Sequence, residues 1–228
     1  MKCGILLNDR EYLLPYARWL VDNQHKFGYS VSGVHSPRRP WTSMTLYKTF
    51  DEIIDSSDIV VSLGYWKVIG KETIDKVPMG IINFHHSYKL QYKGRHAATW
   101  VIRNKEKLHG STMHFIDEHL DCGKIIDTDC FIVNEDDTAE SVFKKSNEIG
   151  FRLLRTNFPK IVTGATINYQ QPVQDSFTYK EEDLSHEIKI GDPDTMLREI
   201  RSLTFTGCPL PYIMLNGRKI SMKLENYE

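Results

Sequence analysis

Short apolar runs alternate with segments of helical apolar spacing over the first 165 residues, and this alternation restricts the fold more than any other feature. The expected strands are four apolar runs, at 2–7, 29–36, 58–65 and 80–87. The expected helices between them include 11–24 and 45–56. Strands that alternate with helices are typical of a mostly parallel sheet with both faces covered. We therefore predict an α/β fold.

The next segments predict how this sheet ends. A helix is expected at 97–108, followed by strands at 111–117 and 123–133. These two strands are joined too tightly for a crossover, so we expect an antiparallel edge. Asp137 then has the position of an N-cap for a long helix through Phe158.

The pattern changes after Gly164, which divides the chain into a catalytic domain at 1–165 and a small β-rich extension at 166–228. Leu215-Asn216-Gly217-Arg218 predicts a type I′ hairpin, and Asp192-Pro193 can begin a helix through Ile200. We expect the extension to serve as a homodimerisation element.

Charge and composition exclude several classes of partner. The 29 Lys and Arg against 30 Asp and Glu argue against nucleic acid or an anionic membrane as a partner. No apolar run approaches the roughly 20 residues that span a bilayer, and the start does not resemble a signal peptide. The four cysteines form no CxxC pair, which favours reduced thiols and a cytoplasmic protein.

Two adjacent histidines follow Asn83 at the end of the strand 80–87. Because neighbouring side chains on a strand point to opposite faces, His85 and His86 cannot easily bind one metal ion, and we expect no metal. Asn83 and His85 do share a face. In open α/β sheets ligands bind beyond the carboxyl ends of strands, where we place this pair and Asp121, from the loop between 111–117 and 123–133.

Asn, His and Asp together suit acyl transfer to an amine. A neutral imidazole can accept a proton near pH 7, and a neighbouring carboxylate can orient the ring. An Asn amide can donate to an oxyanion. Ser87 is no obvious nucleophile, because no GxSxG elbow surrounds it.

An ordered set of motifs over most of 58–165 resembles the folate-dependent formyltransferases, and above all the sugar N-formyltransferases. The set comprises Asn83-Phe84-His85-His86-Ser87, Tyr92-Lys93-Gly94, Trp100, Gly110-Ser111-Thr112 and Asp121-Cys122-Gly123-Lys124-Ile125-Ile126. The resemblance implies a Rossmann-like formyltransferase fold and catalytic roles for Asn83, His85 and Asp121. The chain departs from the family at His86, Leu90 and Ala97, where proline is common.

The resemblance also implies the ligands. The formyl donor N10-formyltetrahydrofolate is expected to contact two loops, at Tyr65, Trp66, Lys67, Val68, Ile69, Ile116, Asp117, Glu118 and Leu120. The acceptor is expected to be a nucleotide-linked amino-deoxysugar, with dTDP as the expected nucleotide. Its expected contacts are Asn8, Arg10, Ser87, Lys89, Tyr92, Lys93, Gly94, Arg95 and His96. Such chemistry implies a place in lipopolysaccharide O-antigen synthesis.

Three alternatives remain open on the sequence. The same residues could hydrolyse formyltetrahydrofolate, or formylate another small amine. The chain could also be a non-catalytic module that binds a sugar nucleotide or folate. This last alternative is disfavoured, because all three catalytic positions are occupied.

Overall fold

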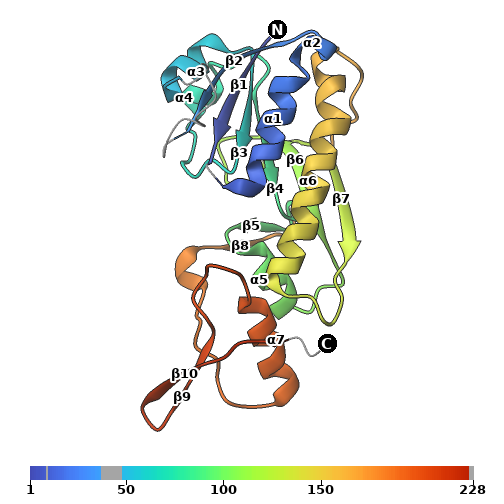
Figure 1. Ribbon diagram of the computed structural model, residues 1–228. Helices are drawn as coiled ribbons and strands as arrows, with labels where there is room; N and C mark the ends of the chain where they lie inside the picture. Colours follow the sequence, from blue (N-terminus) through green and yellow to red (C-terminus); the bar gives the residue numbers. More distant parts are fainter. Residues whose placement is uncertain (9, 37–47, 226–228) are drawn as a thin grey trace.

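A six-stranded sheet organises the computed structural model, which describes residues 1–8, 10–36 and 48–225 (Figure 1). The strand order is β2-β1-β3-β4-β6-β7. The strands are β1 (Lys2–Leu7), β2 (Ser30–His35), β3 (Ile59–Leu63), β4 (Ile81–His85), β6 (Leu108–Phe115) and β7 (Ile125–Ile132). The first four pair in parallel, whereas β6 is antiparallel to both β4 and β7. This confirms the α/β class and the antiparallel edge.

Helices cover both faces of the sheet. α1 (Leu14–Asp22) and α6 (Ala139–Val162) lie over one face, as Figure 1 shows, and enclose the larger apolar core. α3 (Phe50–Ser56) packs on β1 and β2 from the other face, near the short helix α4 (Lys71–Ile74). Alternation within β4 follows the two layers, because Ile82 and Phe84 join the first core and Ile81 the second.

Two helix starts differ in detail from the expectation. The N-cap of α6 is Thr138, not Asp137, because its hydroxyl accepts from the Ser141 N–H. Asp137 instead accepts from the Lys145 ammonium. α3 begins after a Thr49 cap, and positions 45–47 of the helix expected at 45–56 lie outside the described residues.

The C-terminal extension contains one strand pair, a further short strand, a 3-10 turn and a helix. Its elements are β8 (Phe177–Tyr179), the 3-10 turn η3 (Glu181–Asp183), α7 (Pro193–Leu203), β9 (Tyr212–Leu215) and β10 (Arg218–Ser221). β9 and β10 form the predicted hairpin, with positive φ at Asn216 and Gly217 as a type I′ turn requires. It projects from the end of the molecule that is remote from the N-terminus (Figure 1).

The extension is joined to the part that contains the six-stranded sheet through elements that follow β4. These are the 3-10 turn η2 (Tyr88–Leu90), β5 (Tyr92–Gly94) and α5 (Ala97–Arg103). β8 pairs in parallel with β5, and α7 packs on α5. Residues Glu11–Leu13 (η1) and Gln24–Phe27 (α2) complete the helical segments of the described chain.

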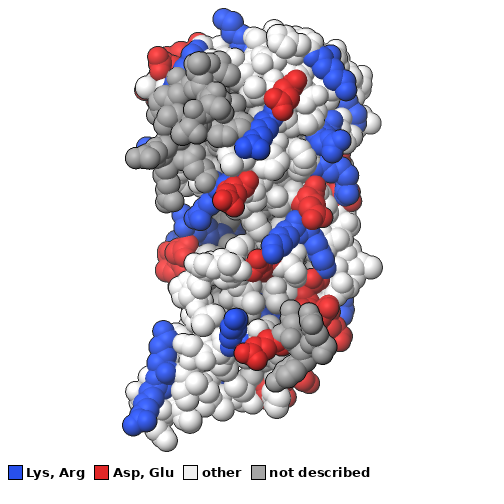
Figure 2. All heavy atoms as spheres, viewed as in Figure 1, with Lys and Arg blue, Asp and Glu red and all other residues white. Residues whose placement is uncertain are grey.

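The face of the molecule shown in Figure 2 carries charges of both signs. Figure 2 shows Lys and Arg interspersed with Asp and Glu over the face in view, in keeping with the balanced composition. Among the described residues, no helix is long and apolar enough to cross a membrane. All four cysteines are unpaired.

Candidate active site

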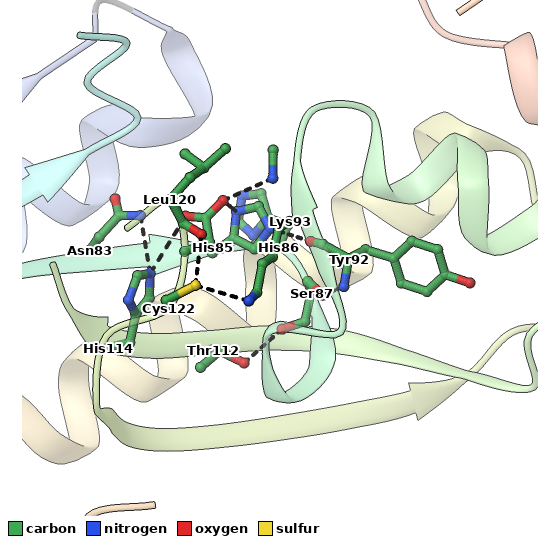
Figure 3. Close-up of polar contacts among 12 residues, drawn as sticks. Asn83, His85, His86, Ser87, Tyr92, Lys93, Thr112, His114, Leu120 and Cys122 are labelled. Carbon is green, nitrogen blue, oxygen red and sulfur yellow. Dashed lines mark hydrogen bonds and ion pairs between the residues drawn. The ribbon is translucent and has the colours of Figure 1, made fainter. Parts of the chain in front are cut away.

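The end of β4 separates its two histidines as strand geometry requires. Asn83 and His85 point to one side, where Figure 3 shows them near His114. His86 turns toward α6, where its ring meets Phe143 edge-on with centroids 5.0 Å apart. The His86 Nδ1 also lies 3.3 Å from the Ser111 hydroxyl. His86 is therefore a packed structural residue.

Asp121 reaches His85 by a route that differs from the expected one. Because β6 is antiparallel to β4, the loop after β6 begins beside Ile81, near the amino end of β4, and not beyond its carboxyl end. The loop then crosses the face of the sheet. Asp121 Oδ2 lies 3.6 Å from His85 Nδ1 and accepts from the Gly94 N–H at 2.9 Å. Its side chain is 9% exposed.

His114 is a site residue that sequence reasoning missed. It lies opposite Asn83 across the β4–β6 pair, 1% exposed, with Nε2 3.3 Å from the Asn83 amide nitrogen (Figure 3). Its Nδ1–H donates to the Phe115 carbonyl at 2.8 Å, so Nε2 is left to accept from Asn83. Burial lowers the pKa of His114 to about 4, although Asp121 acts in the opposite direction. A neutral His114 thus fixes the orientation of the Asn83 amide.

Both ring nitrogens of His85 face an acceptor. Nε2 lies 2.5 Å from the Tyr92 carbonyl, to which it donates, and Nδ1 faces the Asp121 carboxylate. The Nδ1 distance of 3.6 Å is longer than a hydrogen bond. Nδ1 is therefore the atom at which His85 can accept a proton, and the carboxylate can stabilise the resulting cation.

A cavity of about 130 Å³ lies beside this pair, between the loop after β3 and the loop after β6. Asn83, His114 and Asp121 form part of its wall. All nine residues predicted to contact the donor line it: Tyr65, Trp66, Lys67, Val68, Ile69, Ile116, Asp117, Glu118 and Leu120. Ile69 lies within the wall at 6% exposure, whereas Val68 is 87% exposed at the rim.

The residues predicted to contact the acceptor lie in two places. One set lies between Ser87 and His96, around η2 and β5, and the other lies at the end of β1. Lys89 and Leu90 in η2 both have positive φ, so this turn has a backbone conformation of its own at Leu90, where the family commonly has proline. Lys93 Nζ lies 2.9 Å from Cys122 Sγ, beside Asp121 (Figure 3). Arg95 and His96 both contact the Glu181 carboxylate of the extension, at 2.7 and 3.1 Å.

Asn8 and Arg10 lie apart from that turn, at the end of β1. The Asn8 amide donates to the Gly64 carbonyl at 3.1 Å, which ties it to the loop after β3. Arg10 is exposed.

The side chains of Ser87 and Tyr92 are buried and engaged within the protein. Ser87 is fully buried and its hydroxyl accepts from the Tyr92 N–H at 2.8 Å. Tyr92 is 1% exposed and its hydroxyl donates to Glu106 at 2.8 Å. These hydrogen bonds hold the turn between β4 and β5.

No group of three or more His, Cys, Asp or Glu side chains is placed to hold a metal ion among the described residues. A larger cavity of about 390 Å³ between α5 and α7 contains none of the predicted site residues.

Comparison with known proteins shows that the chain is similar to formyl transferases. Residues 48–156 match the model of the formyl transferase family. Methionyl-tRNA formyltransferase of Clostridium tetani is 34% identical over 99 residues, which are 43% of this chain and 32% of that protein. The chain thus spans about a third of the length of this curated relative. The resemblance to the formyltransferases is confirmed.

Solved structures that share the fold of this chain include sugar N-formyltransferases. A sugar N-formyltransferase from a Shewanella species has a TM-score of 0.82 at 19% identity, over 100% of this chain and 98% of its own. The N-formyltransferase of Helicobacter canadensis, solved with folinic acid and dTDP-3-aminofucose, has a TM-score of 0.78 at 21% identity. That alignment covers 96% of this chain and 86% of the other. The fold is therefore that of the formyltransferases, and the sugar N-formyltransferases resemble it over almost their whole length.

Proposed function

We propose that this protein transfers a formyl group from N10-formyltetrahydrofolate to the amine of a nucleotide-linked amino-deoxysugar. One observation carries the proposal: Asn83 and the His85–Asp121 pair meet at a cavity lined by two strand-end loops. Residues 1–165 would supply this catalytic part. The products would be the N-formylated sugar nucleotide and tetrahydrofolate.

The cavity has the chemistry of a site for the flat ring of a folate. Ile69, Ile116 and Leu120 provide apolar walls, and Asp117 and Glu118 provide acceptors at one side. A volume of about 130 Å³ is below the ~300 Å³ at which drug-sized sites begin, so it suits only the ring portion. Trp66 and Val68 at the rim are exposed and would contact the remainder.

The bound donor would supply an activated formyl carbon, which the amine attacks. One N–H of Asn83 points to His114, which leaves its second N–H to donate to the oxyanion that develops. His85 already donates to Tyr92, and its Nδ1 faces Asp121. In this geometry His85 and Asp121 would take the proton lost by the amine, and Asn83 would stabilise the negative charge of the intermediate. The bond from the formyl carbon to N10 of the donor would then break, and the pair would return the proton to N10, so that tetrahydrofolate leaves.

A sugar nucleotide is the proposed acceptor. Lys89, Lys93 and Arg95 surround the turn that leads to the catalytic pair, and cationic side chains suit a diphosphate. The relative from Helicobacter canadensis was solved with dTDP-3-aminofucose, which supports dTDP as the nucleotide. Curated relatives act on methionyl-tRNA, but the balanced charge of this chain does not favour a nucleic-acid partner.

Incubation of the protein with N10-formyltetrahydrofolate and a panel of dTDP- and UDP-linked 3-amino and 4-amino sugars tests the proposal. We expect one acceptor to gain the mass of a formyl group, with tetrahydrofolate formed in equal amount. Formate release without any amine would instead indicate a hydrolase. Formylation of methionyl-tRNA alone would overturn the choice of acceptor.

We further propose a homodimer formed through the hairpin β9–β10, acting in the cytoplasm on precursors of O-antigen sugars. Met214, Leu215 and Ile220 on this hairpin are 42–47% exposed, and an exposed apolar group of this kind is typical of an interface. Light scattering at several concentrations, with Ile220→Glu as the disrupting variant, tests the dimer.

A further inference from the structure

Two backbone groups of the three-residue strand β5 hold the catalytic pair. The Tyr92 carbonyl accepts from His85 Nε2 at 2.5 Å, which orients the ring and leaves Nδ1 toward Asp121. The Gly94 N–H donates to Asp121 Oδ2 at 2.9 Å. Since both contacts come from backbone, the course of β5 determines the distance between the imidazole and the carboxylate.

β5 does not belong to the central sheet. Within the described chain, its strand partner is β8, which lies some 85 residues later in the extension. The Phe177 N–H donates to the Gln91 carbonyl at 2.8 Å, and the Arg95 N–H donates to the Tyr179 carbonyl at 3.0 Å. β8 therefore fixes β5 at both ends.

Side chains reinforce this pairing around Tyr179. Its ring stacks on Trp100 with centroids 4.0 Å apart and planes 9° apart, and it lies parallel to the Tyr92 ring at 6.1 Å. Asn104 donates to both tyrosine hydroxyls, at 3.0 and 3.3 Å. Gly94 has φ +78°, and a Cβ there would lie 2.3 Å from the Tyr179 carbonyl oxygen. The close approach of the two strands thus requires glycine.

We propose that Tyr179 is a positioning residue: through β8 it holds β5, and through β5 it sets the geometry of His85 and Asp121. The extension then takes part in assembling the catalytic pair, besides any role in dimerisation. The kinetic consequence rests on the proposed formyl transfer, whereas the structural consequence at His85 does not.

Tyr179→Ala is the decisive variant. A displacement of about 1 Å in a reacting group can lower a rate about 100-fold, so we expect kcat for formyl transfer to fall roughly 10- to 100-fold. The KM for the donor should stay unchanged, because Tyr179 is absent from the lining of the donor cavity. Tyr179→Phe keeps the stack on Trp100 and should retain wild-type kcat. Tyr179→Leu keeps apolar volume without the stack and replaces the alanine variant if that one fails to fold.

The His85 ring gives a readout that needs no turnover. In ¹⁵N-resolved NMR, wild-type His85 should show the Nε2–H tautomer, held by the Tyr92 carbonyl, and Tyr179→Ala should show a mixture of tautomers. Tyr212→Ala is the matched control, because Tyr212 is a partly buried tyrosine of the same extension that pairs with β10 and not with β5.

The outcomes separate this inference from the proposed function. An unchanged His85 tautomer in Tyr179→Ala, or a loss of kcat no larger than in Tyr212→Ala, would overturn the positioning role. If the wild type transfers no formyl group, the proposed function fails, and the NMR comparison still decides the role of Tyr179.

Discussion

The two sides of β4 carry neighbouring histidines with different environments. His85 lies beside a carboxylate and a cavity wall, 13% exposed. His86 packs beneath α6 against Phe143, with Ser111 as its polar partner. Burial, and then the neighbouring His85, lower the pKa of His86 to about 3. The same residue type therefore lies beside a carboxylate on one side and is held neutral on the other.

The contrast shows what distinguishes the proposed catalytic histidine from its neighbours. Burial alone does not, because His109 on the α6 side is 1% exposed, and both His86 and His109 have a pKa lowered to about 3. A carboxylate within reach does, because it can stabilise the charged ring. Asp121 provides one for His85, whereas no carboxylate among the described residues contributes to the pKa shift of His86 or His109.

Substituting His85 and His86 one at a time should give the largest difference in kcat. His85→Ala and Asp121→Asn should each lower kcat for formyl transfer roughly 10²- to 10⁴-fold, the usual contribution of acid–base catalysis. His86→Leu should keep kcat near wild type while it destabilises the fold by about 1 kcal/mol through the lost Ser111 contact. Steady-state kinetics and urea unfolding measure both. Equal losses of kcat in His85→Ala and His86→Leu would show that the two sides do not differ in function.

Asn83 tests the division of labour within the His85 side. If its free N–H stabilises the oxyanion, Asn83→Ala should lower kcat roughly 10²- to 10³-fold. The donor KM should change little. His114→Phe should reproduce part of that loss, because Asn83 would lose the acceptor that orients it. A higher donor KM with unchanged kcat in Asn83→Ala would assign Asn83 to binding alone.

The sequence predicted what local periodicity determines. Strands β1, β3 and β4 and helix α6 follow from runs of apolar residues, and the Asn83–His85 alternation follows from strand geometry. The role of His114 was not predicted, because its place opposite Asn83 depends on the register of an antiparallel strand pair, which residue spacing does not reveal. The β5–β8 pairing was not predicted either, because two three-residue strands have too few positions to show a period.

A substitution at the rim of the cavity, on the His85 side of the sheet, should have a smaller kinetic effect. Val68→Asp would place a charge on an exposed apolar position of the proposed donor site. The donor KM should rise about tenfold, equal to ~1.4 kcal/mol of lost apolar contact, with kcat unchanged. Leu210→Asp, an exposed position of the extension, is the control. An unchanged KM in Val68→Asp would place the donor elsewhere.

Histidines on the α6 side of the sheet should affect the free energy of unfolding and not kcat. His109 is 1% exposed, and neither ring nitrogen has a hydrogen-bond partner among the described residues. Burial, with His86 and His85 as the nearby charges, lowers its pKa to about 3, below the ~6.5 of an unfolded chain. As pH falls below 6.5, the imidazole therefore becomes protonated in the unfolded state but stays neutral in the folded state. The free energy of unfolding then decreases by ~1.4 kcal/mol per pH unit.

His109→Leu removes that proton uptake. We expect its free energy of unfolding to equal or exceed that of the wild type at pH 7, because a buried group without a partner is lost. Between pH 7 and pH 5 the free energy of unfolding of the wild type should decrease by about 2 kcal/mol more than that of His109→Leu. The exposed His25→Leu should follow the wild type. Urea unfolding at both pH values makes the comparison, and parallel pH dependences in His109→Leu and wild type would show that His109 does not stay neutral in the folded state.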